Sequence, residues 1–357
     1  MKPKFSTIAQ FSVHYCQFLN ADGELTQPLP EFAKPDILLQ LYQQMLLTRT
    51  LDKKAFNLQR TGKMGTYPSS FGQEAVTVGV GSALQKNDVY VPYYRDQGAL
   101  LQRGVNPIDL LRYWGGDERG SDFQDAREDF PICIPIATQT LHAAGVAYAF
   151  KYRQQPRVVV TMLGDGGTSK GDFYEAMNVA GAWNLPVVFV INNNQWAISV
   201  AREKQTHCQT LAQKAIAAGI EGMQVDGNDI IAVRYLTELA IAKARNEQRP
   251  SLIEALTFRL CDHTTADDAK RYVPTEQFDE ALKKEPFIRF ERFLRAQHYL
   301  TDTKQMEITN TVNLQIEQAV QTYLNTPKYD KTDIIDYMYE KLPMSLLDQR
   351  DNIREEI

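Results

Sequence analysis

The sequence of 357 residues predicts an α/β fold: a doubly wound parallel sheet flanked by helices, with an N-terminal arm and a C-terminal helical extension. Two uninterrupted apolar runs, RVVVTML at 157–163 and PVVFVI at 186–191, have the composition of strands buried on both faces. The turn GDGG follows the first run and the triplet NNN follows the second. Their separation of about thirty residues is the length of one strand–helix–strand crossover, the unit from which parallel sheets are built.

The N-terminal part of the chain combines an unpatterned segment with two helices and a strand. Residues 1–35 contain several prolines and little periodicity, which predicts an extended arm. From 36 to 60 apolar residues recur at helical spacing, and Asp36 is the expected N-cap. The segment QEAVTVGVGSALQ at 73–85 predicts a second helix, and DVYVP at 88–92 predicts a short strand.

The rest of the chain alternates helix and strand signals. Residues 115–135 are charged, glycine-rich and aperiodic, which is typical of a mobile loop facing an active site. The pattern then predicts helices at 140–153, 171–183, 209–218 and 229–246, and strands at 222–225 and 251–258. The expected organisation is an extended arm at 1–35, an α/β domain at 36–274 and a helical extension at 275–357.

Composition excludes several function classes. The net charge is −5, from 39 basic and 44 acidic residues, and no basic block points to nucleic acid. The longest apolar run, 185–191, has seven residues, far too few for a membrane span. The N-terminus lacks the pattern of a secretory signal, and four scattered cysteines without a CxxC pair fit a reducing cytoplasm.

The turn and the triplet place polar groups at the carboxyl ends of two strands, where open α/β sheets bind ligands. Glycines let a ligand approach the backbone, and the following helix offers free N–H groups to an anion. Asp165 and Asn192–Asn194 supply oxygen ligands of the kind that Mg²⁺ shares with phosphate. The residues therefore predict a metal-bridged diphosphate site.

Two other phosphate motifs do not fit this turn. A dinucleotide fingerprint needs a third glycine where Ser169 stands, and a P-loop needs Gly-Lys-Ser/Thr where the order is Ser169-Lys170-Gly171. A purely structural alternative is that the glycines shorten the turn while the asparagines form an Asx-turn. That alternative remains open for GDG by itself, but the triplet at the second strand end favours a site.

A GDG turn followed by NN resembles the thiamin-diphosphate motif. The longer pattern is similar to the alpha subunit of the decarboxylating component of 2-oxo acid dehydrogenase complexes, from about residue 36 to the end. The segments that carry the resemblance are SSFGQEA (69–75), YYRDQG (93–98), ATQTLHAAGVA (137–147), EKQT (203–206), QVDGND (224–229) and FRLCDHT (258–264).

The resemblance implies thiamin diphosphate and Mg²⁺ as cofactors and gives individual residues their roles. Asp165, Asn194 and the backbone carbonyl of Trp196 would hold the magnesium. Ile134 would contact the aminopyrimidine through its backbone, and Ile136 would be the wedge that bends the cofactor. The residues implied around the diphosphate are Tyr94, Arg95, Gly164, Gly166, Gly167, Ser169 and Arg259.

His263 is the implied catalytic residue, near the thiazolium and the substrate, as a proton donor or an orienting group. Without that context His263 would be a solvent-exposed loop histidine, and Arg95 and Arg259 would be surface ion-pairing residues. His142, on an otherwise apolar helix face, is interpreted as a core histidine. Trp196 departs from the more usual Tyr or Phe, which is harmless if only its carbonyl binds metal.

Thiamin chemistry also needs a carboxylic acid that activates the aminopyrimidine, and in relatives this acid belongs to a separate domain. One diphosphate-type domain with its extensions takes up nearly all of this chain, so we expect the glutamate to come from a beta subunit in an α2β2 assembly. The resemblance further implies a lipoyl-bearing acyltransferase as partner and a 2-oxo acid as substrate. Pyruvate is preferred, a branched-chain 2-oxo acid or acetoin is the alternative, and a degenerate paralogue that only binds the beta subunit is the non-enzyme hypothesis. We also expect residues 115–135 to become ordered only with cofactor.

Overall fold

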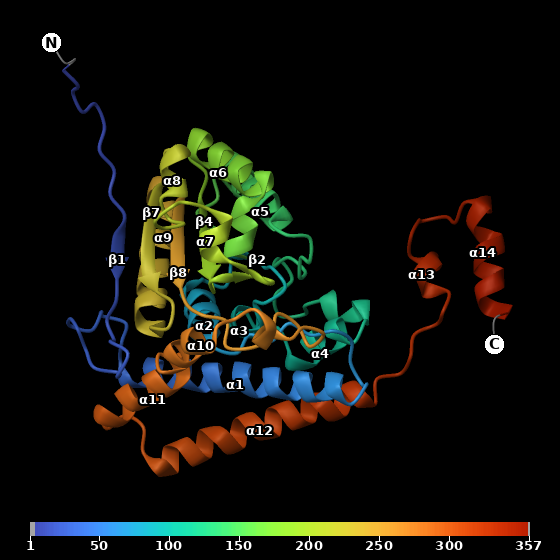
Figure 1. The fold of residues 1–357 in the computed structure, drawn as a ribbon. Helices are drawn as coiled ribbons and strands as arrows, with labels where there is room; N and C mark the ends of the chain where they lie inside the picture. Colours follow the sequence, from blue (N-terminus) through green and yellow to red (C-terminus); the bar gives the residue numbers. More distant parts are fainter. Residues whose placement is uncertain (1–3, 356–357) are drawn as a thin grey trace. The chain divides into compact units, whose positions relative to one another are not determined.

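The computed structural model describes residues 4–355, which form two compact units. The first unit ends at Val320 and contains the sheet, and the second begins at Gln321 (Figure 1). The first unit therefore extends well past residue 274, where the sequence suggested the start of a helical extension. Within the second unit, Arg350 of α14 (Met344–Glu355) pairs with Asp336 of α13 (Asp333–Asp336).

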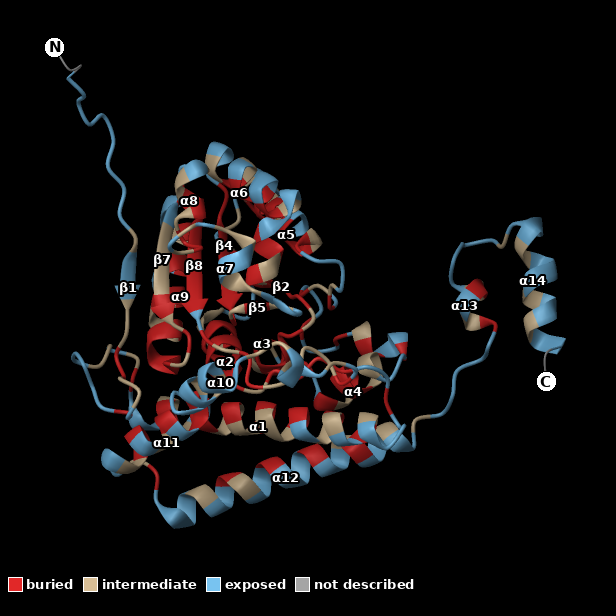
Figure 2. Cartoon of the chain, viewed as in Figure 1, coloured by how far each residue is buried: buried red, intermediate tan, exposed pale blue. Residues whose placement is uncertain are grey.

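A parallel sheet lies at the centre of the first unit, as the apolar runs predicted. Among residues 4–355 it has six strands in the order β1-β7-β8-β4-β3-β2. All neighbouring strands are parallel, and the central ones are buried along their length (Figure 2). The strands are β1 (His14–Cys16), β2 (Val89–Val91), β3 (Val159–Gly164), β4 (Val187–Asn193), β7 (Glu221–Asp226) and β8 (Ser251–Leu256).

The crossovers confirm that the sheet is doubly wound. The step from β3 to β4 through α6 (Gly171–Trp183) and the step from β7 to β8 through α9 (Ile230–Glu247) cross the sheet in opposite directions. Because such crossovers are right-handed, α6 and α9 cover opposite faces. On the first face, α5 (Thr138–Tyr152) and α6 bury small and aromatic side chains against β3 and β4 in one continuous core. On the second face, α9 packs against β4, β7 and β8.

The remaining helices surround the sheet and its loops. The long helix α1 (Pro35–Arg60) was expected to be capped by Asp36, and this was wrong. Its N-cap is Lys34, and Pro35 occupies the first helical position, where a missing N–H has no cost. The other helical segments are α2 (Glu74–Ala83), α3 (Gln97–Gln102), α4 (Pro107–Trp114), η1 (Glu118–Ser121), α7 (Arg202–Gln205), α8 (Lys214–Ala217), η3 (Ala269–Arg271), α10 (Thr275–Leu282), α11 (Pro286–Ala296) and α12 (Asp302–Leu324).

The N-terminal segment is more than an extended arm. Residues His14–Cys16 form an edge strand that pairs in parallel with β7. The buried carboxylate of Asp229, the N-cap of α9, accepts hydrogen bonds from the backbone N–H groups of Phe18 and Leu19, each at 2.6 Å. The arm is thus fastened to the sheet by contacts more than two hundred residues apart, which a local pattern does not reveal.

Two further expectations need correction. His142 is exposed on α5, so it is not a core histidine. The helix predicted at 209–218 shortens to α8.

The loop at 115–135 is tied to the sheet near its end, because Asp129 accepts hydrogen bonds of 2.8 Å from the N–H of Tyr90 and from Arg103. Whether the loop depends on cofactor for its order stays a prediction.

All four cysteines are free thiols. Across residues 4–355, no helix combines the length and the apolar character needed to cross a bilayer.

Candidate active site

The acidic turn and the asparagine triplet meet at one edge of the sheet. Gly164 at the end of β3 lies opposite Asn192 near the end of β4. Asp165 opens η2 (Asp165–Ser169) directly after β3, and Asn194 follows β4. The spacing of about thirty residues is therefore one crossover through α6, as the sequence predicted.

The carboxylate of Asp165 is buried in this corner, with 1% of the residue exposed. Gln205, the last residue of α7, donates a hydrogen bond from Nε2 to Asp165 Oδ2 at 2.8 Å. Among the described residues no lysine, arginine or histidine lies within ion-pairing distance of it. Burial raises the pKa of the Asp165 carboxyl. A buried carboxylate without a counter-ion is costly, and a bound cation would relieve that cost.

Asn194 and Trp196 bring two more oxygen atoms to the same corner. The amide oxygen of Asn194 accepts a hydrogen bond from the N–H of Trp196 at 3.2 Å, and its amide nitrogen donates to Gln73 Oε1 at 3.0 Å. The carbonyl of Trp196 lies 3.4 Å from a guanidinium nitrogen of Arg259. One carboxylate, one amide and one carbonyl form a donor set of the kind that hard cations prefer.

The glycines of the turn are required by space. A Cβ on Gly166 would lie 2.6 Å from Cβ of Ala197, closer than side chains approach one another. A Cβ on Gly167 would lie 3.2 Å from Leu163 and 3.5 Å from Ile136. The turn is thus packed closely against its neighbours, and any added side chain would push into the cavity wall or the neighbouring strand.

Two buried arginines converge on one histidine. A guanidinium nitrogen of Arg95 lies 3.3 Å from Nδ1 of His263, and one of Arg259 lies 3.4 Å from the same atom. Burial, together with the charges of Arg95 and Arg259, lowers the pKa of His263 to about 4. Arg259 also donates to the carbonyl of Ile198 at 2.9 Å and to Tyr272 Oη at 2.5 Å. The cluster has two positive charges and fits an anionic ligand.

A cavity of about 210 Å³ joins the acidic corner to the arginine cluster. Two of its lining residues, Ala137 and Ile198, have positive φ of 64° and 55°, which is strained backbone for residues other than glycine. Most of the residues singled out from the sequence line this one cavity: Tyr94, Arg95, Ile134, Ile136, Gly164, Asp165, Gly166, Gly167, Asn194, Trp196 and His263.

The remaining two predicted site residues lie elsewhere. Ser169 is exposed at the far end of η2 and does not line the cavity. Arg259 stands behind the wall, in contact with the Trp196 carbonyl and with His263. The roles assigned to all these residues stay predictions, although the fold brings nearly all of them together.

A family comparison agrees with this arrangement. The family described as dehydrogenase E1 component matches residues 42–331. The chain belongs to the dehydrogenase E1 component family. This confirms the resemblance seen in the ordered motifs.

Curated relatives extend the similarity to nearly the whole chain. The pyruvate dehydrogenase E1 component subunit alpha of Mycoplasma genitalium is 38% identical over 335 residues, covering 94% of each chain. The proteins of the same name from Staphylococcus aureus and Staphylococcus epidermidis are each 38% identical over 344 residues, covering 95% of this chain and 92% of theirs.

Membership of the E1 family implies thiamin diphosphate, and the residues of this chain fit that cofactor. The carboxylate of Asp165 and the guanidinium of Arg95 both line the cavity and have no ion-pair partner among the described residues, so the cavity suits a ligand that carries both a cation and a diphosphate. In its wall, Oε1 of Gln139 is buried without a hydrogen-bond partner, while Nε2 donates to the carbonyl of Met162 at 2.7 Å. A donor group of a bound ligand would satisfy that oxygen.

Several residues of this E1 site escaped the sequence reasoning. Gln205 contacts Asp165, Gln73 contacts Asn194, and the carbonyl of Ser69 accepts a hydrogen bond from Arg95. All three lie in segments that carried the resemblance, SSFGQEA and EKQT. The sequence therefore marked these segments as similar to the family but did not indicate what the three residues contact. Asp267 accepts hydrogen bonds from the N–H of His263 and from Tyr272 and so links two parts of this loop.

Proposed function

We propose that this chain is the alpha subunit of a pyruvate dehydrogenase that transfers acetyl groups. It would bind thiamin diphosphate and Mg²⁺ and act with a beta subunit on pyruvate, passing the acetyl group to a lipoyl-lysine. The observation that carries the proposal is the cavity itself. At one end it has the buried Asp165 carboxylate, which forms no ion pair among the described residues, and at the other it has Arg95 and His263, with Arg259 behind them.

The residues of the chain would divide the work of binding and orientation. Asp165, the amide oxygen of Asn194 and the Trp196 carbonyl would hold magnesium, and Arg95 would hold the diphosphate. Bound thiamin diphosphate supplies the carbanion chemistry, because its thiazolium ring accepts the electrons released when carbon dioxide leaves. The ring of His263 is unprotonated at neutral pH in the absence of an anion, so it enters the site as a hydrogen-bond acceptor or base.

The cavity lacks a second acid, which supports a split active site. Among the described residues that line the cavity, Asp165 is the only one with a carboxylate, and it is the proposed metal ligand. The acid that activates the aminopyrimidine must then come from outside this cavity wall. We therefore assign it to a glutamate of the beta subunit.

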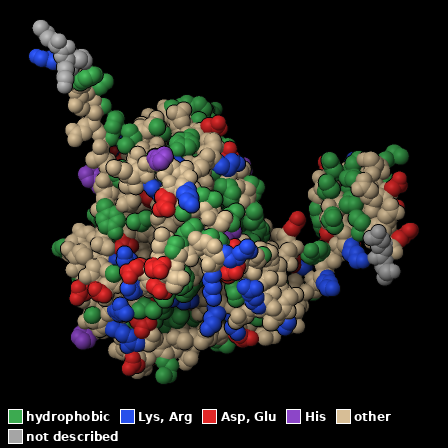
Figure 3. Space-filling view, viewed as in Figure 1, with side chains coloured by type: hydrophobic (Ala, Val, Ile, Leu, Met, Phe, Trp, Pro, Cys, Tyr) green, Lys and Arg blue, Asp and Glu red, His purple; other side chains and the backbone are tan. Residues whose placement is uncertain are grey.

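Exposed apolar side chains on α5 and α6 and at the cavity mouth support the partner. Tyr148 of α5 is 47% exposed and its ring lies 5.3 Å from that of Trp183 at the end of α6, also exposed. Figure 3 shows hydrophobic side chains at the surface over the part of the molecule where Figure 1 places α5 and α6. Ile134 and Ile136, which line the cavity, are also exposed and directly precede α5. Exposed apolar side chains at a cavity mouth are typical of an interface that closes an active site.

Reduction of an artificial electron acceptor tests the function. The chain alone and the chain co-purified with a candidate beta subunit would receive Mg²⁺, thiamin diphosphate and either pyruvate, a branched-chain 2-oxo acid or acetoin. We expect activity only in the pair and fastest with pyruvate, as the names of the relatives suggest. Activity of the chain alone would contradict the split site, and a faster reaction with another substrate would contradict the assignment to pyruvate.

A further inference from the structure

Arg95 is a buried cation that no carboxylate contacts directly. It is 1% exposed, and its guanidinium donates to two carbonyl oxygens, that of Ser69 and, at 2.9 Å, that of His263. Across residues 4–355 no ion pair includes Arg95. Its direction into the cavity therefore depends on where the two carbonyls point.

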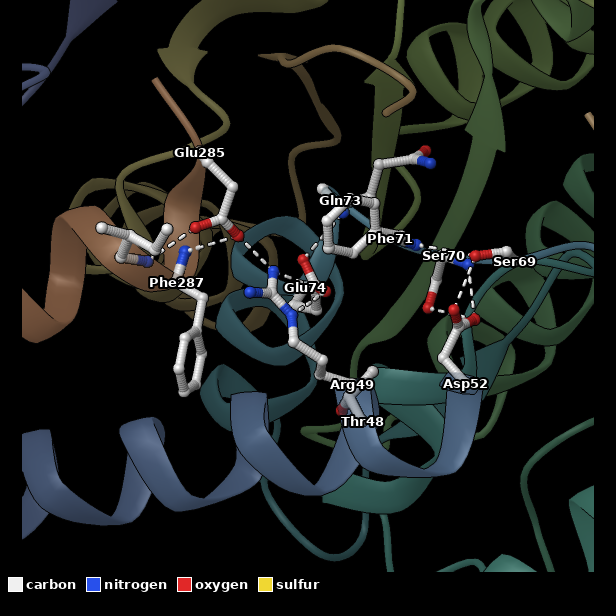
Figure 4. Close-up of polar contacts among 12 residues, drawn as sticks. Thr48, Arg49, Asp52, Ser69, Ser70, Phe71, Gln73, Glu74, Glu285 and Phe287 are labelled. Carbon is white, nitrogen blue, oxygen red and sulfur yellow. Dashed lines mark hydrogen bonds and ion pairs between the residues drawn. The ribbon is translucent and has the colours of Figure 1, made fainter. Parts of the chain in front are cut away.

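Asp52 of α1 fixes the first of these carbonyls. It is 6% exposed and lies outside the cavity lining. Its carboxylate accepts hydrogen bonds from Ser69 Oγ at 2.6 Å and from the N–H of Ser70 at 2.7 Å (Figure 4). It also accepts a hydrogen bond from Tyr67 Oη at 3.0 Å. Within the described chain it too has no ion-pair partner. Burial raises its pKa, while these hydrogen bonds and the charge of Arg95 oppose the rise.

The same stretch of chain is held at its other end. Arg49, one helical turn before Asp52, pairs with Glu74 at 2.8 Å and with Glu285, the N-cap of α11 (Figure 4). Glu74 also accepts a hydrogen bond from the N–H of Gly72 at 3.0 Å. Between these anchors, Gln73 contacts Asn194. Residues 69–74 are thus fastened to α1 on one side and touch both ends of the cavity on the other.

Building on the proposed function, we propose that Asp52 is a positioning residue for the diphosphate site, acting through Ser69 on Arg95. The carboxylate pins the Ser69–Ser70 turn, and the pinned carbonyl of Ser69 aims the guanidinium at the cavity. The negative charge of Asp52 also partly offsets the positive charge of Arg95, from which it is separated by Ser69. This lowers the cost of burying the guanidinium away from water before an anion binds. Loss of the charge would leave the turn unpinned and Arg95 free to rotate toward other acceptors.

The test measures binding by the chain co-purified with its beta subunit. Calorimetry with Mg²⁺ and either thiamin diphosphate or inorganic diphosphate would compare the wild type with Asp52→Asn and the milder Tyr67→Phe. We expect Asp52→Asn to bind both ligands about 10-fold to 100-fold more weakly, as for loss of other groups that orient ligand-binding residues, and Tyr67→Phe to lie between. KM for thiamin diphosphate should rise while kcat at saturating cofactor changes by about two-fold or less.

Asp229→Asn is the matched control. Asp229 is also buried, accepts hydrogen bonds from four backbone N–H groups, has no ion-pair partner in the described chain, and anchors a different corner of the fold. We expect it to lower the melting temperature without changing either affinity. Equal affinities for Asp52→Asn and the wild type, with only the melting temperature lowered as in Asp229→Asn, would overturn the proposal.

A double-mutant cycle shows whether Asp52 acts through Arg95. In an Arg95→Gln background, Asp52→Asn should weaken diphosphate binding no further, because the group that it positions is gone. An equal loss in both backgrounds would overturn the proposed route. Failure of the wild-type pair to bind thiamin diphosphate would sink the proposed function instead, and inorganic diphosphate would still report the coupling of Asp52 to Arg95.

Discussion

Gln205 donates a hydrogen bond of 2.8 Å to the carboxylate of Asp165, yet no lysine, arginine or histidine of the described chain forms an ion pair with that carboxylate. The glutamine orients the group without neutralising it. The raised pKa of Asp165 means that the folded protein holds the ionised form at a cost, which grows as pH rises above the ordinary value for an aspartate.

Asp165→Asn should therefore stabilise the cofactor-free protein while removing its function. Removing a buried, unpaired charge is expected to raise the free energy of unfolding at neutral pH by about 1 kcal/mol or more. The rise in melting temperature caused by Mg²⁺ with thiamin diphosphate should disappear. Thermal unfolding with and without both ligands measures the two effects, and a variant less stable than the wild type without ligands would contradict the interpretation of Asp165.

His263 predicts a pH dependence of stability. Its folded pKa of about 4 lies below the usual 6.5, because burial and the two arginines disfavour the imidazolium. As pH falls from 6.5 to 4, the unfolded chain takes up a proton that the folded chain refuses, so stability is lost over this window. After allowance for the partial exposure of the ring, the loss is roughly 1–2 kcal/mol. Denaturant unfolding at pH 7 and at pH 4.5 measures this loss. The free energy of unfolding of His263→Asn should fall by that much less than the free energy of the wild type. An equal fall in both proteins would argue against the effect of the arginine cluster on His263.

Gly166 predicts a steric limit at the turn. Gly166→Ala places a methyl group 2.6 Å from Cβ of Ala197, which should cost about 1–3 kcal/mol of stability and weaken cofactor binding. Gly171→Ala at the start of α6 is the control, since its nearest neighbour is a flexible side-chain atom at 3.9 Å. The control should change stability by roughly 0.5 kcal/mol or less. Similar losses for both variants would mean that the turn tolerates a side chain.

The loop at 115–135 should be protected from proteolysis when the cofactor binds. Its end is tied to β2 through Asp129, while Arg127 is exposed and pairs with Asp122 on the surface. We expect trypsin to cleave after Arg127 more slowly when Mg²⁺ and thiamin diphosphate are present. Cleavage after the exposed Lys328, in the second unit, serves as an internal reference. Equal rates at Arg127 with and without cofactor would show that the loop does not respond to it.

The sequence was most informative where chemistry follows a buried strand. β3 and β4 are built on apolar runs, and the polar residues at and after the ends of these runs fall at the sheet edge by geometry alone. Strand β1 was missed because it has three residues and is specified by its pairing with β7 and by Asp229, far away in the sequence.

The residues that hold the cavity-lining residues in place were less predictable from the sequence than the cavity-lining residues themselves. Asp52 looks like any polar residue of a long helix, and its role depends on how α1 crosses the Ser69–Ser70 turn. The exposure of His142 depends in the same way on which face of α5 turns toward the sheet. Tertiary packing decides such features, and periodicity constrains packing only loosely.

The most direct test of the account is a crystal structure of the chain with its beta subunit, thiamin diphosphate and Mn²⁺ in place of Mg²⁺, with anomalous scattering used to locate the metal. We expect a peak at coordinating distance from a carboxylate oxygen of Asp165, the amide oxygen of Asn194 and the carbonyl of Trp196, with Arg95 on the diphosphate. A metal bound elsewhere, or a cofactor whose diphosphate lies away from the turn at Gly166, would contradict it.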